Sequence, residues 1–302
     1  MTHEPSRDEL LAAILLADEE GLNAGEYPAQ RTMTTIFRVM RKLGFEGYTF
    51  AGSGTDPLVD RIHDLIKQIY RPEDIAVGAM HLGVFMFRDV FARIVVPPGY
   101  GTCAVDPFRC TNLTETQLGW LARRQEDRNA FHDQFADIWD FGWGVQELGH
   151  ARPVTPDCEN FLDLARFHLQ AAAAVVTGAF DLGGAVQSSL IAAELALKGG
   201  LAANGLSLSD LKSLGHDLPA LATELAKHEA KLDGVRIATT VGKLPEYVPN
   251  RYSPAQPDRR TTGQIVMGAQ YVAGEVIRQL TDRNFRAIAK NYPARSYPPL
   301  PP

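Results

Sequence analysis

The chain has 302 residues, of which 45% are hydrophobic and 22% are charged, an ordinary composition for a globular protein with a sizeable buried core. The formal net charge of −6 argues against wholesale electrostatic binding to nucleic acid, because such binding favours strongly basic surfaces. The sequence contains no apolar run of the roughly 18 residues that a membrane-spanning helix needs. Its N-terminus carries acidic residues where a signal peptide needs basic ones, so we expect a cytoplasmic protein without membrane contact.

The charge is unevenly distributed along the chain. Residues 1–154 contain 15 Lys and Arg against 22 Asp and Glu, whereas residues 155–302 contain 15 against 14. The last 25 residues hold four arginines and one lysine against a single acidic residue, Asp282. The acidity therefore lies in the first half, and the C-terminus is locally basic.

Three amphipathic helices are predicted near the N-terminus, because apolar residues recur there at steps of three and four. The second ends before Gly44, a natural helix stop, and the third has Pro57 in its first turn. The three helices span residues 8–20, 29–43 and 57–70.

The apolar stretch over residues 75–96 has a composition that allows strands. Its length and the absence of a turn signal instead favour one buried helix. Arg88 and Asp89 would then lie inside an apolar helix, where charges need partners. Further helices are predicted over 115–124, with Thr114 as its cap, and over 125–141.

Alanine and leucine dominate the composition after residue 157. The segment 242–260 contains four prolines and cannot form a regular helix. We predict an all-α fold with a helical domain over 1–150, a helical bundle over 157–285 and an exposed Pro-rich tail over 286–302. The helices of the second half are predicted at about 159–178, 184–203, 217–231 and 262–281.

The acidic residues of the first half have no catalytic spacing. The stretch GSGTDPLVDRIHD (52–64) is not a phosphate-binding loop, and its aspartates are four residues apart, which suits a solvated face of a capped helix. Asp133, Asp137 and Asp140 share one face of the helix over 125–141, which we interpret as solvated, with a metal or active site as the alternative. The sequence has no zinc signature, and we expect no metal and no cofactor.

Other reactive side chains are scattered. Three cysteines without a Cys-x-x-Cys pair are typical of reduced thiols, with a two-cysteine metal site or disulfide as the alternative. A lone histidine on an apolar face, such as His81, is most often a core residue. The spacing does not indicate a cluster among four histidines scattered through the first half, which are His63, His81, His132 and His150.

The predicted helical hairpin over 188–226 carries several polar residues in an otherwise apolar stretch. Glu194 and Lys198 are four residues apart, in the favourable order for a helical ion pair. Asp217 can cap the helix that follows. His216 has no such structural explanation.

Residues 160–285 resemble the HEPN family of small helical domains. The stretches AAELALKG, GHDL and NRYSP carry the resemblance, together with the order of helix, hairpin, Pro-rich joint and final long helix. The first 150 residues resemble no family. The resemblance implies a helical bundle that tends to form homodimers, and it places Arg251 in the joint and His216 in the GHDL motif.

Members of that family are either metal-independent ribonucleases or non-catalytic proteins that bind nucleotides or partner proteins. Catalytic members carry an arginine followed after four to six residues by a histidine, whereas Arg251 is followed here by YSPAQPD. We therefore expect non-catalytic recognition of RNA, a nucleotide or a partner protein, with phosphate contacts from Arg251, Arg259 and Arg260 and with His216 nearby. The alternatives are a ribonuclease using His216 and Arg251, and a dimerisation scaffold without a ligand.

Overall fold

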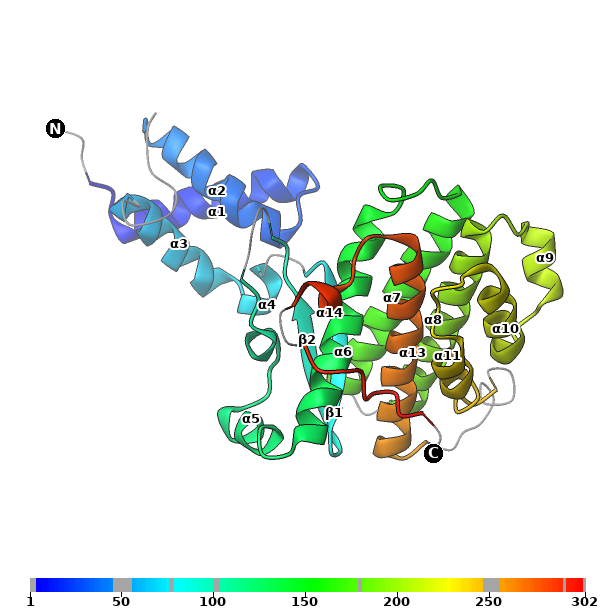
Figure 1. Cartoon of the computed structure of the whole chain (residues 1–302). Helices are drawn as coiled ribbons and strands as arrows, with labels where there is room; N and C mark the ends of the chain where they lie inside the picture. Colours follow the sequence, from blue (N-terminus) through cyan, green and yellow to red (C-terminus); the bar gives the residue numbers. More distant parts are fainter. Residues whose placement is uncertain are drawn as a thin grey trace. The chain divides into compact units, whose positions relative to one another are not determined.

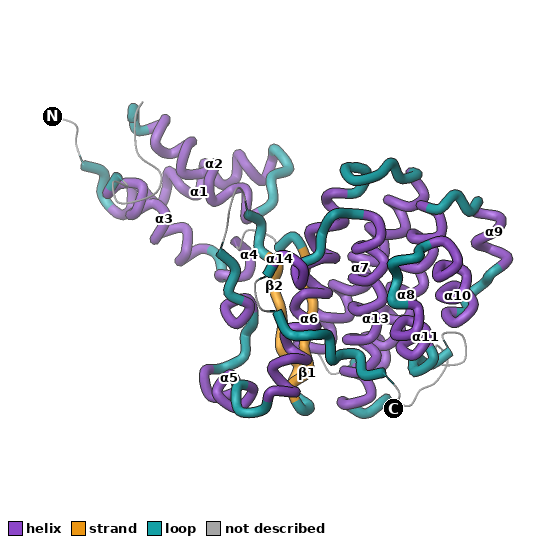
Figure 2. The backbone as a smooth tube through the Cα atoms, viewed as in Figure 1, coloured by secondary structure: helices purple, strands orange, loops and turns teal. Residues whose placement is uncertain are grey.

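The computed structural model describes residues 4–45, 56–75, 79–99, 104–178, 181–246, 256–289 and 292–300. The chain divides into two compact units, residues 1–78 and 79–302, and each is described by itself. Helices make up most of both units (Figures 1 and 2), which confirms the predicted all-α class. The boundary predicted near residue 150 falls inside the second unit, where helices from both sides of it pack together.

The first unit is a set of helices around one apolar core. Ser6 and Glu9 form a capping box at the start of α1, and Asp56 caps α3 by accepting from the Leu58 amide. The predicted helices are confirmed, and Asp60 and Asp64 of α3 are exposed, as predicted for a solvated face. The elements are α1 (Arg7–Asn23), α2 (Pro28–Lys42), α3 (Pro57–Ile69) and α4 (Pro72–Ile75).

The second unit begins with two strands and continues as helices. The strands are β1 (His81–Phe87) and β2 (Val90–Val96), followed by the short 3-10 helix η1 (Pro107–Cys110). The remaining elements are α5 (Glu115–Leu121), α6 (Gln125–Gly144), η2 (Val145–Glu147), α7 (Pro156–Gly178), α8 (Leu182–Ala203), α9 (Leu208–Ser213), α10 (Leu218–His228), α11 (Gly234–Val241), α13 (Arg259–Leu280) and α14 (Phe285–Ile288).

The prediction of one helix over 75–96 is wrong, because residues 81–96 form the antiparallel hairpin β1–β2. Arg88 and Asp89 form its exposed turn, and Arg88 adopts a positive φ of 61°, a conformation that a two-residue hairpin turn requires and that glycine usually supplies. Phe87 pairs with Val90 across this turn. The Val, Ile and Phe residues of this stretch favour strands, and strands form although no typical turn residue separates them in the sequence.

The hairpin is joined to the helical bundle through polar and close-packed contacts. The side-chain amide of Gln270 in α13 donates to the Val84 carbonyl and accepts from the Val84 amide, both at 2.8 Å. This arrangement satisfies backbone groups at the open edge of β1. Gly83 lies against Ile138 of α6 so closely that a side chain at this position would meet it at 2.6 Å.

The core of the second unit lies where α7, α8 and α13 pack side by side (Figure 1). Small residues permit the close approach, and Gly200 of α8 lies directly against Val276 of α13. Nearly every residue of α13 from Thr262 to Ile277 is buried. Within the described part of the chain, no helix is both long enough and apolar enough to cross a bilayer.

The aspartates of α6 do not form the solvated face that we predicted. Asp133, Asp137 and Asp140 are all fully buried, and arginines from the C-terminal part of the chain pair with them. Arg278 donates to Asp137 and Asp140 at 3.0 Å each, and Arg295 donates to Asp137 at 2.6 and 2.9 Å. The reason is that buried carboxylates require charged partners, which lie more than a hundred residues away in sequence.

These pairs also hold the C-terminal tail against the bundle. Asp133 accepts from the backbone amides of Ser296 and Tyr297 at 2.7 and 2.8 Å, and it pairs with Arg286. The Pro298 carbonyl accepts from Arg236 at 2.6 Å, and Pro298 is buried. The tail is irregular in structure, but the prediction that it is exposed does not hold for this part of it.

Candidate functional site

His216, the unexplained residue of the hairpin, lies against Glu194. Its Nδ1 is 2.9 Å from one carboxylate oxygen of Glu194 and 3.0 Å from the other. Lys198 donates to the same carboxylate at 2.7 Å, which confirms the predicted pair, and Asp217 caps α10 as expected. The His216 side chain is 57% exposed, whereas those of Glu194 and Lys198 are 10% and 12% exposed.

The predicted arginines lie elsewhere on the fold. Arg251 is outside the described residues. The Nε of Arg259 donates to the Asp89 carbonyl at 2.9 Å, and its guanidinium lies 4.6 Å from the centre of the Phe91 ring. Arg260 is exposed at the start of α13. No contact within the described residues joins Arg259 or Arg260 to His216.

The histidines of the second unit do not form a cluster. His81 is fully buried beside Phe141, as expected for a core residue, and burial lowers its pKa to about 3. His132 contacts Phe108 and Tyr292 instead. Across the described ranges, no group of three or more His, Cys, Asp or Glu side chains is arranged to hold a metal ion.

Two of the cysteines can be placed. Cys110 and Cys158 are both free thiols. Burial raises the pKa of Cys158 to about 12 and also raises the pKa of Cys110. Cys103 lies outside the described residues, so the prediction of reduced thiols is tested for two positions.

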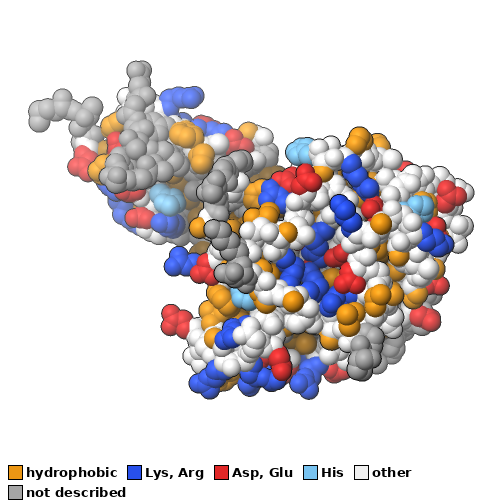
Figure 3. Space-filling model, in the orientation of Figure 1, with side chains coloured by type: hydrophobic (Ala, Val, Ile, Leu, Met, Phe, Trp, Pro, Cys, Tyr) orange, Lys and Arg blue, Asp and Glu red, His pale blue; other side chains and the backbone are white. Residues whose placement is uncertain are grey.

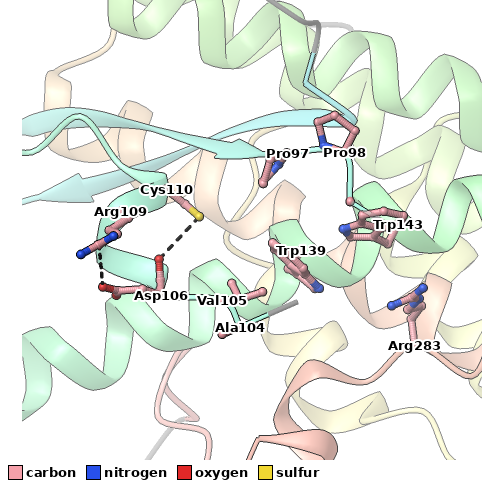
Figure 4. Close-up of a pocket in the computed structure, with 11 residues that line it drawn as sticks. Pro97, Pro98, Ala104, Val105, Asp106, Arg109, Cys110, Trp139, Trp143 and Arg283 are labelled. Atoms are coloured by element: carbon pink, nitrogen blue, oxygen red, sulfur yellow. Dashed lines mark hydrogen bonds and ion pairs between the residues drawn. The ribbon is translucent and has the colours of Figure 1, made fainter. Parts of the chain in front are cut away.

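Another candidate site is a pocket of about 860 Å³ beside α6, which we call the tryptophan pocket. Its volume is in the range of sites that bind small molecules. Trp139 and Trp143 supply two indole rings from successive turns of α6, with their centres 6.2 Å apart. Figure 4 shows these rings beside Arg283, with Pro97 and Pro98 at the end of β2 and the turn around Asp106 completing the wall.

The polar groups of the tryptophan pocket lie at its edges. The Arg283 guanidinium is 5.2 Å from the centre of the Trp143 ring and pairs with Glu147, and this hydrogen bonding raises the pKa of Arg283. On the opposite side, the Nε of Arg109 lies 3.6 Å from a carboxylate oxygen of Asp106 (Figure 4). The pocket thus combines aromatic faces with two arginines, of which Arg283 is held by Trp143 and Glu147 and Arg109 is exposed, an arrangement suited to a planar ligand that carries negative charge.

From the sequence, the aromatic stretch IWDFGWG could form a partner-binding surface or a site, with a core position as the more common outcome, and no ligand was assigned to it. Trp139 and Trp143 are four residues apart in IWDFGWG, a spacing that places two side chains on one helical face. That spacing was the available signal, but the same pattern is the usual signature of a core-facing surface. The position of Arg283 beside Trp143 depends on the packing of α13 and the following turn against α6, which no local pattern reveals.

Comparisons with known proteins leave the family open. No family model, curated protein or solved structure matches this chain. The HEPN resemblance of residues 160–285 therefore stays a prediction.

Proposed function

We propose that this protein recognises a nucleotide, free or within single-stranded RNA, without cleaving it, and that the tryptophan pocket holds the base. The observation that carries the proposal is the convergence of Trp139, Trp143 and Arg283 on one pocket. Indole rings stack on any nucleobase, and stacking contributes about 1–3 kcal/mol per base. The resemblance of residues 160–285 to HEPN domains supports the same ligand class.

The charged groups at the pocket edges fit the same ligand. Arg283 and Arg109 each pair with a carboxylate, that of Glu147 and that of Asp106, so these four groups are neutral together. A phosphate at this rim would be bound by guanidinium N–H donors and would not require a strongly basic protein. Arg260, exposed at the start of α13, remains a predicted phosphate contact.

Calorimetric titration with AMP, GMP, CMP and UMP tests the proposal. We expect binding that weakens as salt rises and that weakens about tenfold in Trp143→Leu and in Trp139→Leu, because each loses one stacking surface. Trp120→Phe is the matched control, since Trp120 lies in α5 and does not line the pocket. Equal affinity in all three variants, or no binding to the wild-type protein, contradicts the proposal.

Ribonuclease activity is the second candidate function, and one observation favours it. His216 is exposed and its Nδ1 contacts the mostly buried carboxylate of Glu194, which would orient the ring for proton transfer. Cleavage of labelled RNA in EDTA that is lost in His216→Ala but kept in His228→Ala would establish this function. His228 is a suitable control because it lies at the other end of α10, the helix that His216 precedes, and its Nε2 is 3.4 Å from a carboxylate oxygen of a glutamate, Glu224.

A further inference from the structure

A second pocket, of about 470 Å³, adjoins the chain segment that follows Arg283. Four cationic side chains line it, those of Lys231, Arg278, Arg286 and Arg295, and one carboxylate, Glu275. We call it the arginine pocket. Figure 3 shows Lys and Arg side chains gathered in a hollow over α13 and α14, on the face turned toward the viewer.

The side chains that line this pocket are mostly cationic. Its lining carries four positive charges and one negative charge. Asp133, Asp137 and Asp140, which pair with the arginines, are fully buried, so an anion in the pocket meets guanidinium groups before it meets carboxylates. Counted with Glu275, the buried aspartates equal the four lining cations in number, so attraction for an anion comes from the guanidinium groups that lie nearer to it, because Coulomb attraction falls with distance.

The arginines are also held in place before any ligand arrives. Arg278 is only 7% exposed and pairs with three carboxylates, those of Asp137, Asp140 and Glu275. The Arg286 and Arg295 guanidinium groups each lie 5.0 Å from the centre of a tyrosine ring, that of Tyr292 and that of Tyr271. Fixed guanidinium groups lose little conformational entropy when they bind an anion.

The hydrogen-bonding capacity of the arginines is not exhausted by these pairs. A guanidinium has five N–H donors. Arg295 donates through Nη1 and Nη2 to Asp137 and to the Tyr297 carbonyl. Arg286 donates through Nη1 and Nη2 to Asp133 and to the Pro293 carbonyl, so these contacts leave the Nε–H of both arginines unused. Lys231, which is exposed, comes from the separate turn between α10 and α11 and adds a cation at the pocket edge. Anchoring of the tail explains the buried pairs, but it does not explain why these cations border one open pocket.

We propose that the arginine pocket is a binding site for a phosphate group, separate from the tryptophan pocket. Arginine forks match phosphate oxygens, which accept several N–H bonds at once. The phosphate is either a free anion or one phosphate of a bound RNA strand. This proposal does not depend on base stacking in the tryptophan pocket, so either proposal can fail without the other.

Two substitutions test the site without breaking a buried ion pair. Asn284→Asp adds a negative charge to the pocket lining, and aspartate keeps the cap that Asn284 provides to the Ala287 amide. Lys231→Glu reverses a charge at the exposed edge. Lys212→Glu is the matched control for the charge change, because Lys212 is an exposed lysine of α9 that does not line the pocket.

The measurements are calorimetric titrations with inorganic phosphate and with the pentanucleotide U5. We expect Asn284→Asp and Lys231→Glu to weaken binding about tenfold, from the added repulsion, whereas Lys212→Glu leaves it unchanged. Inorganic phosphate binding to the wild-type protein would show that a free anion suffices. An effect on U5 alone would identify a nucleic-acid phosphate, and either result supports the site.

Two results would overturn the proposal of a phosphate site in the arginine pocket. It is overturned if neither probe binds the wild-type protein at millimolar concentration, or if both bind Asn284→Asp and Lys231→Glu as they bind the wild type. Trp143→Leu separates the two proposals, because it is expected to weaken U5 binding and to leave inorganic phosphate binding intact.

Discussion

Removing the charge of Asp137 should strongly destabilise the second unit. Asp137 is fully buried and accepts from Arg278 at 3.0 Å and from Arg295 at 2.6 and 2.9 Å. In Asp137→Asn the size of the side chain is kept, so no cavity forms. In this variant Arg278 still pairs with two carboxylates, those of Asp140 and Glu275. Arg295 loses its carboxylate partner and still donates to the Tyr297 carbonyl. Breaking a buried pair in this way costs about 3–5 kcal/mol, and we expect a loss near the lower end.

Urea unfolding followed by tryptophan fluorescence measures this loss. All three tryptophans, Trp120, Trp139 and Trp143, lie in the second unit, so the signal reports that unit alone. Asp163→Asn is the control: Asp163 pairs with Arg166 at 3.0 Å but is 50% exposed, and such pairs contribute about 0–1 kcal/mol. Equal losses for the two variants would refute the view that the buried cluster holds the tail and α13 to α6.

Two further predictions concern the packing around α6. Burial lowers the pKa of His81 to about 3, whereas the pKa of a histidine in the unfolded chain is about 6.5. Between these two values the unfolded chain binds a proton that the folded chain does not, so the free energy of unfolding falls as pH drops from 6.5 toward 3, by up to about 1.4 kcal/mol per pH unit. Urea midpoints measured at pH 7, 6 and 5 should fall less steeply in His81→Leu than in the wild type, and an equal fall in both proteins would contradict this. Gly274→Ala should lower the free energy of unfolding by about 1–3 kcal/mol, because a Cβ there would lie 2.8 Å from the Asp137 carbonyl oxygen. Gly119→Ala, with open space around it, should raise the free energy of unfolding by up to about 1 kcal/mol. Equal thermal midpoints for these two variants would refute the close approach of α6 and α13.

The helices were predictable because local patterns determine them. Periodic apolar residues and caps such as Thr114 and Asp217 act within a few residues of the chain, and the structure confirms these positions. The two short helices α9 and α11 were missed, because elements of six and eight residues carry too little periodicity to stand out.

The hairpin and the buried aspartates were not predictable in the same way. A turn at Arg88 and Asp89 lacks the glycine or asparagine that normally marks a two-residue loop, so the strands looked like one long apolar segment. Asp133 and its neighbours on α6 have the spacing of a solvated face. Their burial depends on Arg278, which the packing of α13 against α6 places, and on Arg286 and Arg295, which are placed only when the chain after α13 folds back.

The candidate site was partly visible in the sequence. The pair of Glu194 and Lys198 was predicted from its spacing, whereas the contact of His216 with Glu194 was not. The tryptophan pocket was not visible, since a pair of tryptophans four residues apart is more often part of a core. Only the packing of Arg283 beside Trp143 separates a ligand pocket from an apolar contact.

The central claim is that the protein binds a nucleotide or RNA and does not cleave it. The most direct measurement incubates the purified protein with labelled single-stranded RNA in EDTA, and follows binding by fluorescence anisotropy and chain length on a denaturing gel. We predict intact RNA that is bound by the wild-type protein and bound about tenfold more weakly by Trp143→Leu. Cleavage that disappears in His216→Ala would contradict the claim and establish a ribonuclease. Intact RNA without binding would also contradict it and would favour a scaffold, to be tested by sedimentation for a stable dimer.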